Sequence, residues 1–271
     1  MGADSNLCMN KLALIDTSIL AAATRDKAVG RGLFQLIATE KLFCGIGVET
    51  LLELRADPNT FSTIASWLQI MPFFICTPHK EVIAYENRRD QCEAFKPILI
   101  SLFGKPFEEI QSFVSDCASI VDEEFPLEKK APLLLHLTGM VKNYPPSNTK
   151  SGYSRQEIES FIAIITKAVL NGHNDAPYFR NHNLVYDPSV FRSIESKAAI
   201  VFWKFYKMRD RNPRESDILD IQMSYLFPYF DYVLTEGNIA SDIRQMQKKL
   251  GIMSGVQRVL TQKDLRRYTD S

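Results

Sequence analysis

The chain of 271 residues lacks any excess of charge, since 32 Lys and Arg residues balance 32 Asp and Glu residues. Any contact with nucleic acid would therefore need a local basic patch rather than a strong overall positive field. The chain also lacks an apolar run near the roughly 20 residues that cross a bilayer. Its first twelve residues hold no apolar segment of a secretion signal. We therefore expect a cytoplasmic protein without membrane contact.

Cysteine and histidine are scarce, and neither forms a recognisable site. The cysteines are odd in number, and none lies in a CxxC pair, so we expect reduced thiols rather than disulfides. His173 and His182 have Asp175 and Asp187 nearby, but their spacing does not fit a compact zinc-ligand pattern. A polar surface loop is the favoured interpretation. The five cysteines are Cys8, Cys44, Cys76, Cys92 and Cys117.

Short apolar runs alternate with helix-like segments in the first part of the chain. This strand–helix order predicts an α/β fold with a parallel central sheet flanked by helices. The expected strands are 11–15, 41–46 and 72–76, and the expected helices are 19–40, with a break near Gly30–Gly32, 48–55 and 59–70.

The character of the sequence changes between residues 78 and 211, where helical patterns dominate. We expect a mainly helical insertion there, packed on an α/β core made of residues 1–77 and 212–271. In the stretch FWKFYKMRDR the helical spacing predicts aromatic side chains in the core, with Lys204 and Lys207 facing water. The expected helices are roughly 80–95, 107–121, 132–141, 156–170 and 189–211.

The stretch RESDILDIQMSYLFPYFDYVLTEGN (residues 214–238) carries the strongest chemical signal. A three-residue spacing places Asp217 and Asp220 on one face of a helix whose other positions are largely apolar. We expect Pro228 to end this helix, a β-prone run at 230–235 to follow, and 236–238 to form a polar turn. Ionised carboxylates on a buried helix are costly unless they are paired or bound to a metal. The pattern therefore indicates a metal site.

Other acidic residues follow predicted strands. Asp16 ends the first strand, Thr235 and Glu236 end the late strand, and Glu53 lies in the helix after the second strand. In an open parallel sheet, ligands collect at the carboxyl ends of the strands. Converging oxygen ligands without Cys or His suit Mg²⁺ or Mn²⁺, which activate water and neutralise a scissile phosphate.

The segments LALIDTSIL, VETLLEL and SDILDIQMSYLFPYFDYVLTEGN together resemble the PIN-domain family of metal-dependent nucleases. By this resemblance Asp16 matches the first acidic position and Glu53, which precedes Leu54, matches the second better than Glu49 does. Asp220 matches the third position, with Asp217 as a co-ligand one turn earlier. The last position falls on Glu236 or Asn238, where the family more often has Asp. Thr17, Thr235 and Asn238 would support the site.

The resemblance implies an endonuclease that uses Mg²⁺ or Mn²⁺ to cut RNA or single-stranded nucleic acid. It further suggests a toxin or defence effector, an inhibitory or assembly partner protein, and a homodimer. The matching segments leave 78–215 unexplained, and this insertion is much longer than the compact family core. We expect it to cover the site and select the substrate.

Each candidate residue also has a purely structural explanation. Asp16 could cap a helix, Glu53 could face solvent, and Asp217 could be an acid favoured by the helix dipole. Thr235 could satisfy a turn. A group of basic residues near the chain end could either contact phosphate or form an ordinary solvated surface. This group comprises Lys248, Lys249, Arg258, Lys263, Arg266 and Arg267.

Two other function classes stay open. A catalytically inactive PIN-like protein could keep the fold and act as a binding partner or scaffold. A phosphatase of the class with a DxDx nucleophile motif would also place an Asp at the end of its first strand. Against this alternative, the residue two positions after Asp16 is Ser18 rather than Asp.

Overall fold

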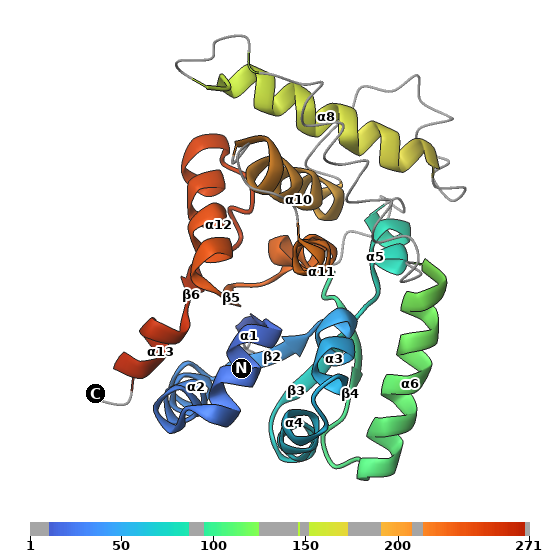
Figure 1. The fold of residues 1–271 in the computed structure, drawn as a ribbon, viewed down its shortest axis with the longest axis vertical. Coiled ribbons are helices and arrows are strands. Elements are labelled where there is room, and N and C mark those ends of the chain that lie inside the picture. The colour runs from blue at the N-terminus through green and yellow to red at the C-terminus, as the bar shows by residue number, and fades with distance from the viewer. Residues whose placement is uncertain are drawn as a thin grey trace, which may run out of the picture.

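The computed structural model describes residues 11–86, 95–124, 146, 152–172, 191–207 and 214–268. Figure 1 shows the described elements, with a central sheet between two groups of helices. The helix expected over 132–141 lies outside the described residues, as do His173 and His182.

The centre of the molecule is a six-stranded sheet in the order β4-β3-β2-β1-β5-β6. All neighbouring strands are parallel except β3 and β4, which run antiparallel. This confirms the predicted α/β fold with a mostly parallel sheet. The strands are β1 (Leu12–Ile15), β2 (Phe43–Ile46), β3 (Phe73–Cys76), β4 (Ile98–Ser101), β5 (Tyr232–Leu234) and β6 (Arg258–Leu260).

The two faces of the sheet form two separate cores, as alternation along β1 illustrates. Ala13 and Ile15 pack on one side, while Leu12 and Leu14 pack on the other. Every residue of β1, β3 and β5 is buried, which is why these strands read as continuous apolar runs.

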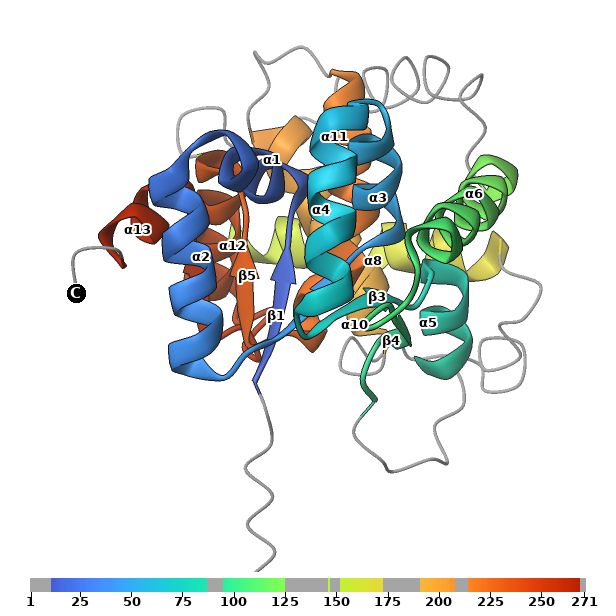
Figure 2. The same ribbon diagram turned by 90° about the horizontal axis from the view of Figure 1, so that it is seen from below.

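The first core is covered by helices that mostly come from the start of the chain, as the view in Figure 2 also shows. They are α1 (Thr17–Arg25), α2 (Lys27–Glu40), α3 (Val48–Arg55), α4 (Pro58–Ile70), α6 (Phe107–Glu124) and α13 (Gln262–Arg267).

The second core is covered by helices from the middle and the end of the chain. They are α5 (His79–Glu86), α8 (Arg155–Gly172), α10 (Arg192–Val201), the π-helix η2 (Phe202–Lys207), α11 (Glu215–Met223), the 3-10 helix η3 (Ser224–Tyr229) and α12 (Gly237–Leu250). Among the described residues, no helix has the length and apolar character that a bilayer span requires.

The break in the first helical segment lies at Asp26, and the expected break near Gly30–Gly32 is wrong. The Asp26 carboxylate accepts hydrogen bonds from the amides of Ala28 and Val29 and so starts α2. Gly30 and Gly32 lie inside α2, where the lack of a side chain allows close approach of other backbone segments.

The late stretch differs from expectation at two points. Pro228 does not end a helix, because the chain tightens from α11 into η3, which contains Pro228 and runs to Tyr229. The predicted polar turn at 236–238 is also wrong, since α12 begins at Gly237 with Glu236 as its N-cap residue. The connection between β5 and α12 is therefore very short, as is common between a strand and a helix in α/β folds.

The 78–211 segment is more closely joined to the core than a purely helical insertion would be. It contributes β4, which pairs with β3 at the edge of the sheet. It also supplies the buried rings of Phe202, Trp203 and Tyr206 to the second core. The expectation that these aromatic side chains are core residues is confirmed.

Glu86 fixes the start of α10 from the neighbouring helix α5. Its carboxylate accepts hydrogen bonds from the Ser193 amide at 2.8 Å, from the Ser193 hydroxyl at 2.5 Å and from the Tyr229 hydroxyl. Burial raises the pKa of Glu86 to about 7, although these donors and the charge of Arg192 oppose the rise. The nearby Glu195, itself largely buried, has a pKa raised to about 7 by burial and by the charge of Glu86.

Glu86 should make the protein less stable as pH rises. Its folded-state pKa lies above the unfolded value of 4.5, so its contribution is largest below pH 4.5 and is lost as pH rises through about 7. The loss should amount to roughly 2–3 kcal/mol. Urea unfolding between pH 5 and 8 should show a shallower decline for Glu86→Gln than for the unchanged chain. The exposed Glu108 supplies the control Glu108→Gln, and equal slopes in all three proteins would contradict this explanation.

Gly32 should be essential to the packing of α2 against α13. A Cβ atom at Gly32 would lie 1.9 Å from the backbone oxygen of Leu265, which cannot move aside like a side-chain end. We expect Gly32→Ala to lower the free energy of unfolding by about 2–3 kcal/mol. A Cβ atom at Gly237 meets no atom within 4 Å, so Gly237→Ala in urea unfolding is the control. A Gly32→Ala protein as stable as this control would refute the close contact.

Candidate functional site

The carboxyl ends of β1 and β5 bring Asp16 and Thr235 together. The two strands are neighbours, with Ile15 opposite Leu234, so the residue after each strand lies at the same edge. The Thr235 hydroxyl donates to Asp16 Oδ2 at 2.8 Å, and the Ser18 hydroxyl donates to the same oxygen at 2.9 Å. Asp16 is buried, with 6% of its surface exposed.

Asp16 occupies the N-cap position of α1, but its carboxylate does not act as the cap. Its backbone oxygen accepts from the amides of Ile19 and Leu20, while its side chain makes no capping hydrogen bond. The carboxylate instead faces Thr235 across the sheet edge. A capping role therefore does not explain why an acid stands at this position.

Asp217 and Asp220 lie one turn apart on α11 and share the ammonium group of Lys204. Lys204 Nζ donates to Asp217 Oδ1 at 3.0 Å and to Asp220 Oδ2 at 2.5 Å. Asp217 is fully buried, and its other oxygen accepts from the Arg214 amide at 2.8 Å. Asp220 is more open, with 21% of its side chain exposed. The sequence thus correctly placed both acids on one face.

The expectation that Lys204 faces water is wrong, since only 2% of its surface is exposed. The reason is the π-helix η2, whose wider turn shifts the residues that face inward relative to an α-helix. Helical spacing of 3.6 residues therefore misassigns Lys204, although Lys207 is exposed as expected. The only hint in the sequence was indirect: two acids on a buried helix need a cation.

Negative charge is concentrated around Asp220. Burial raises the pKa of Asp220 to about 6, and the charges of Asp16 and Glu236 raise it further while Lys204 opposes them. Asp16 and Glu236 therefore both lie near enough to Asp220 for their charges to act on it. Burial lowers the pKa of Lys204, but the charges of Asp220 and Asp217 outweigh this and raise it, so Lys204 is a cation.

Comparisons with protein-family models, with curated proteins and with solved structures find no match to this chain.

Glu53 of α3 is joined to the Asp16 loop. The Thr17 hydroxyl donates to the Glu53 carboxylate, so Glu53 is held beside the residue that follows Asp16. Glu49 is buried in the first turn of α3, and its charge acts on the thiols of Cys76 and Cys117 instead.

The remaining predicted residues lie at the start of α12. Glu236 is half-buried at the N-cap position, and its side chain makes no capping hydrogen bond. Asn238 is exposed in the first turn of the helix.

Within the part of the chain that the structure describes, no group of three or more Asp, Glu, His or Cys side chains is arranged so that it could hold a metal ion.

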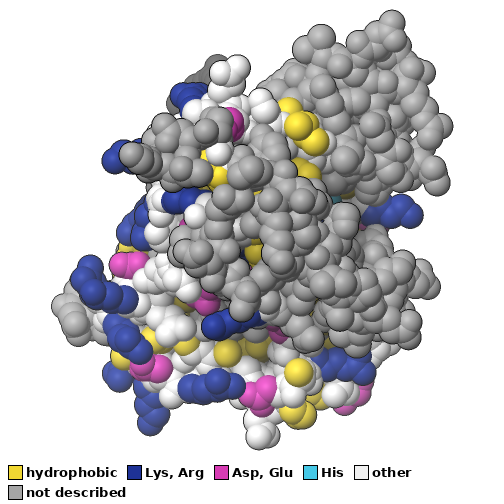
Figure 3. Space-filling view, turned by 45° about the horizontal axis from the view of Figure 1, so that its top comes forward, with side chains coloured by type: hydrophobic (Ala, Val, Ile, Leu, Met, Phe, Trp, Pro, Cys, Tyr) yellow, Lys and Arg dark blue, Asp and Glu magenta, His cyan; other side chains and the backbone are white. Residues whose placement is uncertain are grey.

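Two of the basic residues near the chain end are paired with acidic side chains. Arg258 pairs with Glu40 at 3.1 Å, and Arg266 pairs with Asp26 at 2.9 Å. Lys248 and Lys249 lie at the far end of α12. On the face shown in Figure 3, Lys and Arg side chains alternate with acidic ones. A phosphate-binding strip of these residues is not apparent from their arrangement.

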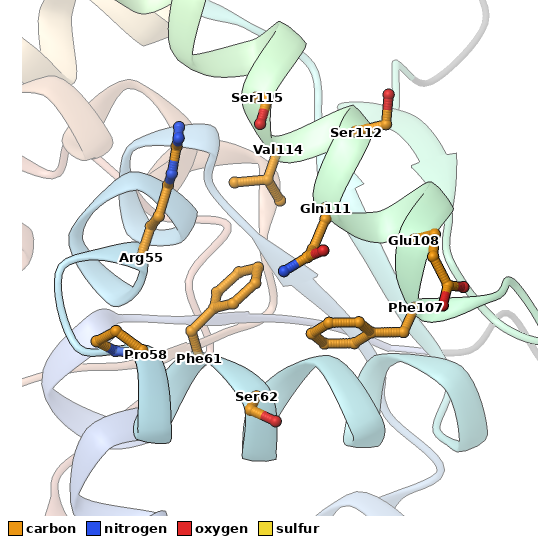
Figure 4. Close-up of a pocket in the computed structure, with 10 residues that line it drawn as sticks. All are labelled: Arg55, Pro58, Phe61, Ser62, Phe107, Glu108, Gln111, Ser112, Val114 and Ser115. Carbon is orange, nitrogen blue, oxygen red and sulfur yellow. The ribbon is translucent and has the colours of Figure 1, made fainter.

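A separate groove of about 680 Å³ lies between α4 and α6. Figure 4 shows the rings of Phe61 and Phe107 on its floor, with Arg55 at one end and Gln111 above. None of the predicted site residues lines it. The groove is therefore distinct from the acidic group at the sheet edge.

Removing one charge from the buried ion pair should be costly. Asp217→Asn leaves the Lys204 ammonium in the core with Asp220 alone, and we expect a loss of roughly 3 kcal/mol in the free energy of unfolding. The matched control is Glu159→Gln, which breaks the exposed Arg155–Glu159 pair and should cost under about 1 kcal/mol. Chemical unfolding at pH 7.5 measures both, and similar losses would show that the buried pair adds little.

Proposed function

We propose that this chain is a PIN-like endonuclease that uses Mg²⁺ or Mn²⁺ to hydrolyse phosphodiester bonds of RNA or single-stranded nucleic acid. The observation that carries the proposal is the meeting of Asp16 and Thr235 at the adjoining carboxyl ends of β1 and β5, where the charges of Asp16 and Glu236 also act on Asp220 of α11. These acids come from distant parts of the sequence, and their order follows the resemblance to the PIN-domain family.

The donor set suits a hard divalent cation in its charge and ligand type. Oxygen ligands from carboxylates are what Mg²⁺ and Mn²⁺ prefer. Burial raises the pKa of Asp220 to about 6 despite its pairing with Lys204, and the charges of Asp16 and Glu236 add to the rise, so a divalent cation here would favour the ionised carboxylates. Asp16, Asp220 and Glu236 would hold the ion, with Glu53 beside them. Asp217 fits less well, because Lys204 and the Arg214 amide already engage its two oxygens.

The protein's own residues would prepare this site before any cation binds. The hydroxyls of Thr235 and Ser18 both donate to Asp16 Oδ2, and these two hydrogen bonds orient the carboxylate. Thr17 holds the Glu53 carboxylate in the same way. A bound Mg²⁺ or Mn²⁺ would supply an activated water and neutralise charge on the phosphate. A role as a toxin or defence effector, with an inhibitory partner protein, rests on the resemblance alone.

A second candidate function is a catalytically inactive PIN-like binding or scaffold protein. The observation that favours it is the ammonium of Lys204, which already supplies positive charge to Asp217 and Asp220. A site that has lost its metal would need such an internal cation. The phosphatase alternative has less support, since Ser18 serves as a hydrogen-bond donor to Asp16 where that class would have a second acid.

Cleavage of labelled single-stranded RNA and DNA with Mn²⁺ or Mg²⁺ tests the two candidates. We expect chelation to abolish cutting, and Asp16→Asn and Asp220→Asn each to lower the rate at least about 100-fold, since both would remove a ligand charge. Asp116→Asn, at an exposed position on α6, should cut like the unchanged chain.

Circular dichroism and unfolding must first show that each variant is folded. Cutting that persists in both site variants would reject this site. Failure to cut any substrate, together with no Mn²⁺ binding by calorimetry, would favour the scaffold function.

A further inference from the structure

The groove between α4 and α6 has the size and the floor of a small-ligand site. Its volume of about 680 Å³ falls within the range of roughly 300–1,000 Å³ that is usual for such sites. The rings of Phe61 and Phe107 form the floor, with centroids 6.5 Å apart and planes inclined at 57° (Figure 4). A flat ring that lies against one of them presents its edge to the other, which is a favourable aromatic arrangement. The floor therefore suits a flat aromatic ligand.

The two ends of the groove carry opposite charges. Arg55, the last residue of α3, stands at one end, and Glu108 of α6 stands at the other (Figure 4). Asp57, the acid nearest to Arg55 on the C-terminal side, is already engaged, since it pairs with Arg25 at 2.9 Å and accepts from the Thr60 hydroxyl at 2.7 Å. No described acidic side chain forms an ion pair with Arg55, so its guanidinium is open to an anionic ligand.

Polar side chains line the groove between these two ends. Gln111 extends from α6 toward the space over the two rings (Figure 4). Within the described part of the chain, the side chains of Gln111, Ser62 and Ser112 make no hydrogen bond, so they are open to a ligand. An amide both donates and accepts, and it can therefore recognise the polar edge of a nucleic-acid base.

We propose that this groove binds one nucleotide of a single-stranded nucleic acid, with its base against Phe61 and Phe107 and its phosphate on Arg55. The inference rests on the proposed function for the class of ligand, but it uses none of the acids at the sheet edge. The charges fix the orientation of the nucleotide, because Glu108 repels a phosphate and accepts hydrogen bonds from the exocyclic amino group of a base. Gln111 then bonds to the base edge.

The groove and the proposed acidic site share one helix. Glu53 and Arg55 both belong to the last turn of α3. Glu53 accepts from the Thr17 hydroxyl next to Asp16, whereas Arg55 stands at one end of the groove. A strand that is cut at the sheet edge would therefore place a nearby nucleotide in the groove. Since every base has a flat face, such stacking adds affinity without requiring a particular sequence.

Fluorescence anisotropy of a labelled single-stranded RNA of about ten nucleotides tests the groove on the full chain. The titrations contain EDTA, so that binding is measured without any divalent ion. Arg55→Gln should weaken binding and make the slope of log affinity against log salt concentration shallower by about 0.7, because one phosphate contact is lost. Arg31→Gln changes an exposed arginine of α2 outside the groove, and this control should leave the slope unchanged.

The aromatic floor has a separate test in the same assay. Phe107→Leu keeps an apolar side chain but removes the flat ring, so we expect roughly fivefold weaker binding with an unchanged salt slope. A ring that was purely structural would not affect RNA affinity in a folded variant. Circular dichroism checks folding first. If Phe107→Leu does not fold, the salt slope of Arg55→Gln decides, since Arg55 is exposed and its replacement leaves the core intact.

The outcomes separate this inference from the proposed function. RNA binding with the same affinity and salt slope in the unchanged chain, Arg55→Gln and folded Phe107→Leu would overturn this inference, even if the chain cuts RNA. Failure to bind the RNA at all would also overturn it. Binding that both variants weaken, in a chain that cuts no substrate with Mn²⁺ or Mg²⁺, would reject the nuclease function and support the groove as a nucleic-acid site.

Discussion

The burial of one ammonium group between two carboxylates is the interaction on which the carboxyl edge of the sheet depends. Lys204 comes from the segment that the sequence presents as an insertion, whereas Asp217 and Asp220 belong to α11, which leads into β5. Since each buried charge would be costly alone, the three groups must assemble together. The ion pair therefore joins η2 of this segment to α11, which precedes β5.

Parallel topology explains how residues far apart in the sequence meet. Asp16 and Thr235 are separated by 219 positions, yet their strands are neighbours and end at the same edge. The helix that follows each strand turns the chain away, so the first residue after the strand is left at the edge. The hydroxyls of Thr235 and Ser18 then fix Asp16. The geometry of this region follows from strand order more than from any local motif.

The sequence was sufficient to predict β1, β2, β3 and β5 and the acids that follow β1 and β5, because buried parallel strands are short apolar runs with a clear end. It could not predict the inward direction of Lys204, since a π-helix breaks the 3.6-residue periodicity on which the interpretation relied. It also missed β4, whose largely exposed residues lack the pattern of a buried strand. The sequence analysis placed the helix break at Gly30–Gly32, because two glycines are a more obvious break signal than one acid. The actual break at Asp26 depends on the capping hydrogen bonds of a single carboxylate.

The charge balance at the sheet edge argues against a purely structural role for these acids. An ion pair in a core can often be replaced by apolar side chains of similar volume without loss of stability. Here burial raises the pKa of Asp220, and the nearby charges of Asp16 and Glu236 raise it further while Lys204 opposes them. Folding thus brings like charges together at a cost in stability, and such a cost is typical of binding and catalytic sites. A bound cation would offset this repulsion, which is the physical reason for the binding function that we propose for the acids at this edge.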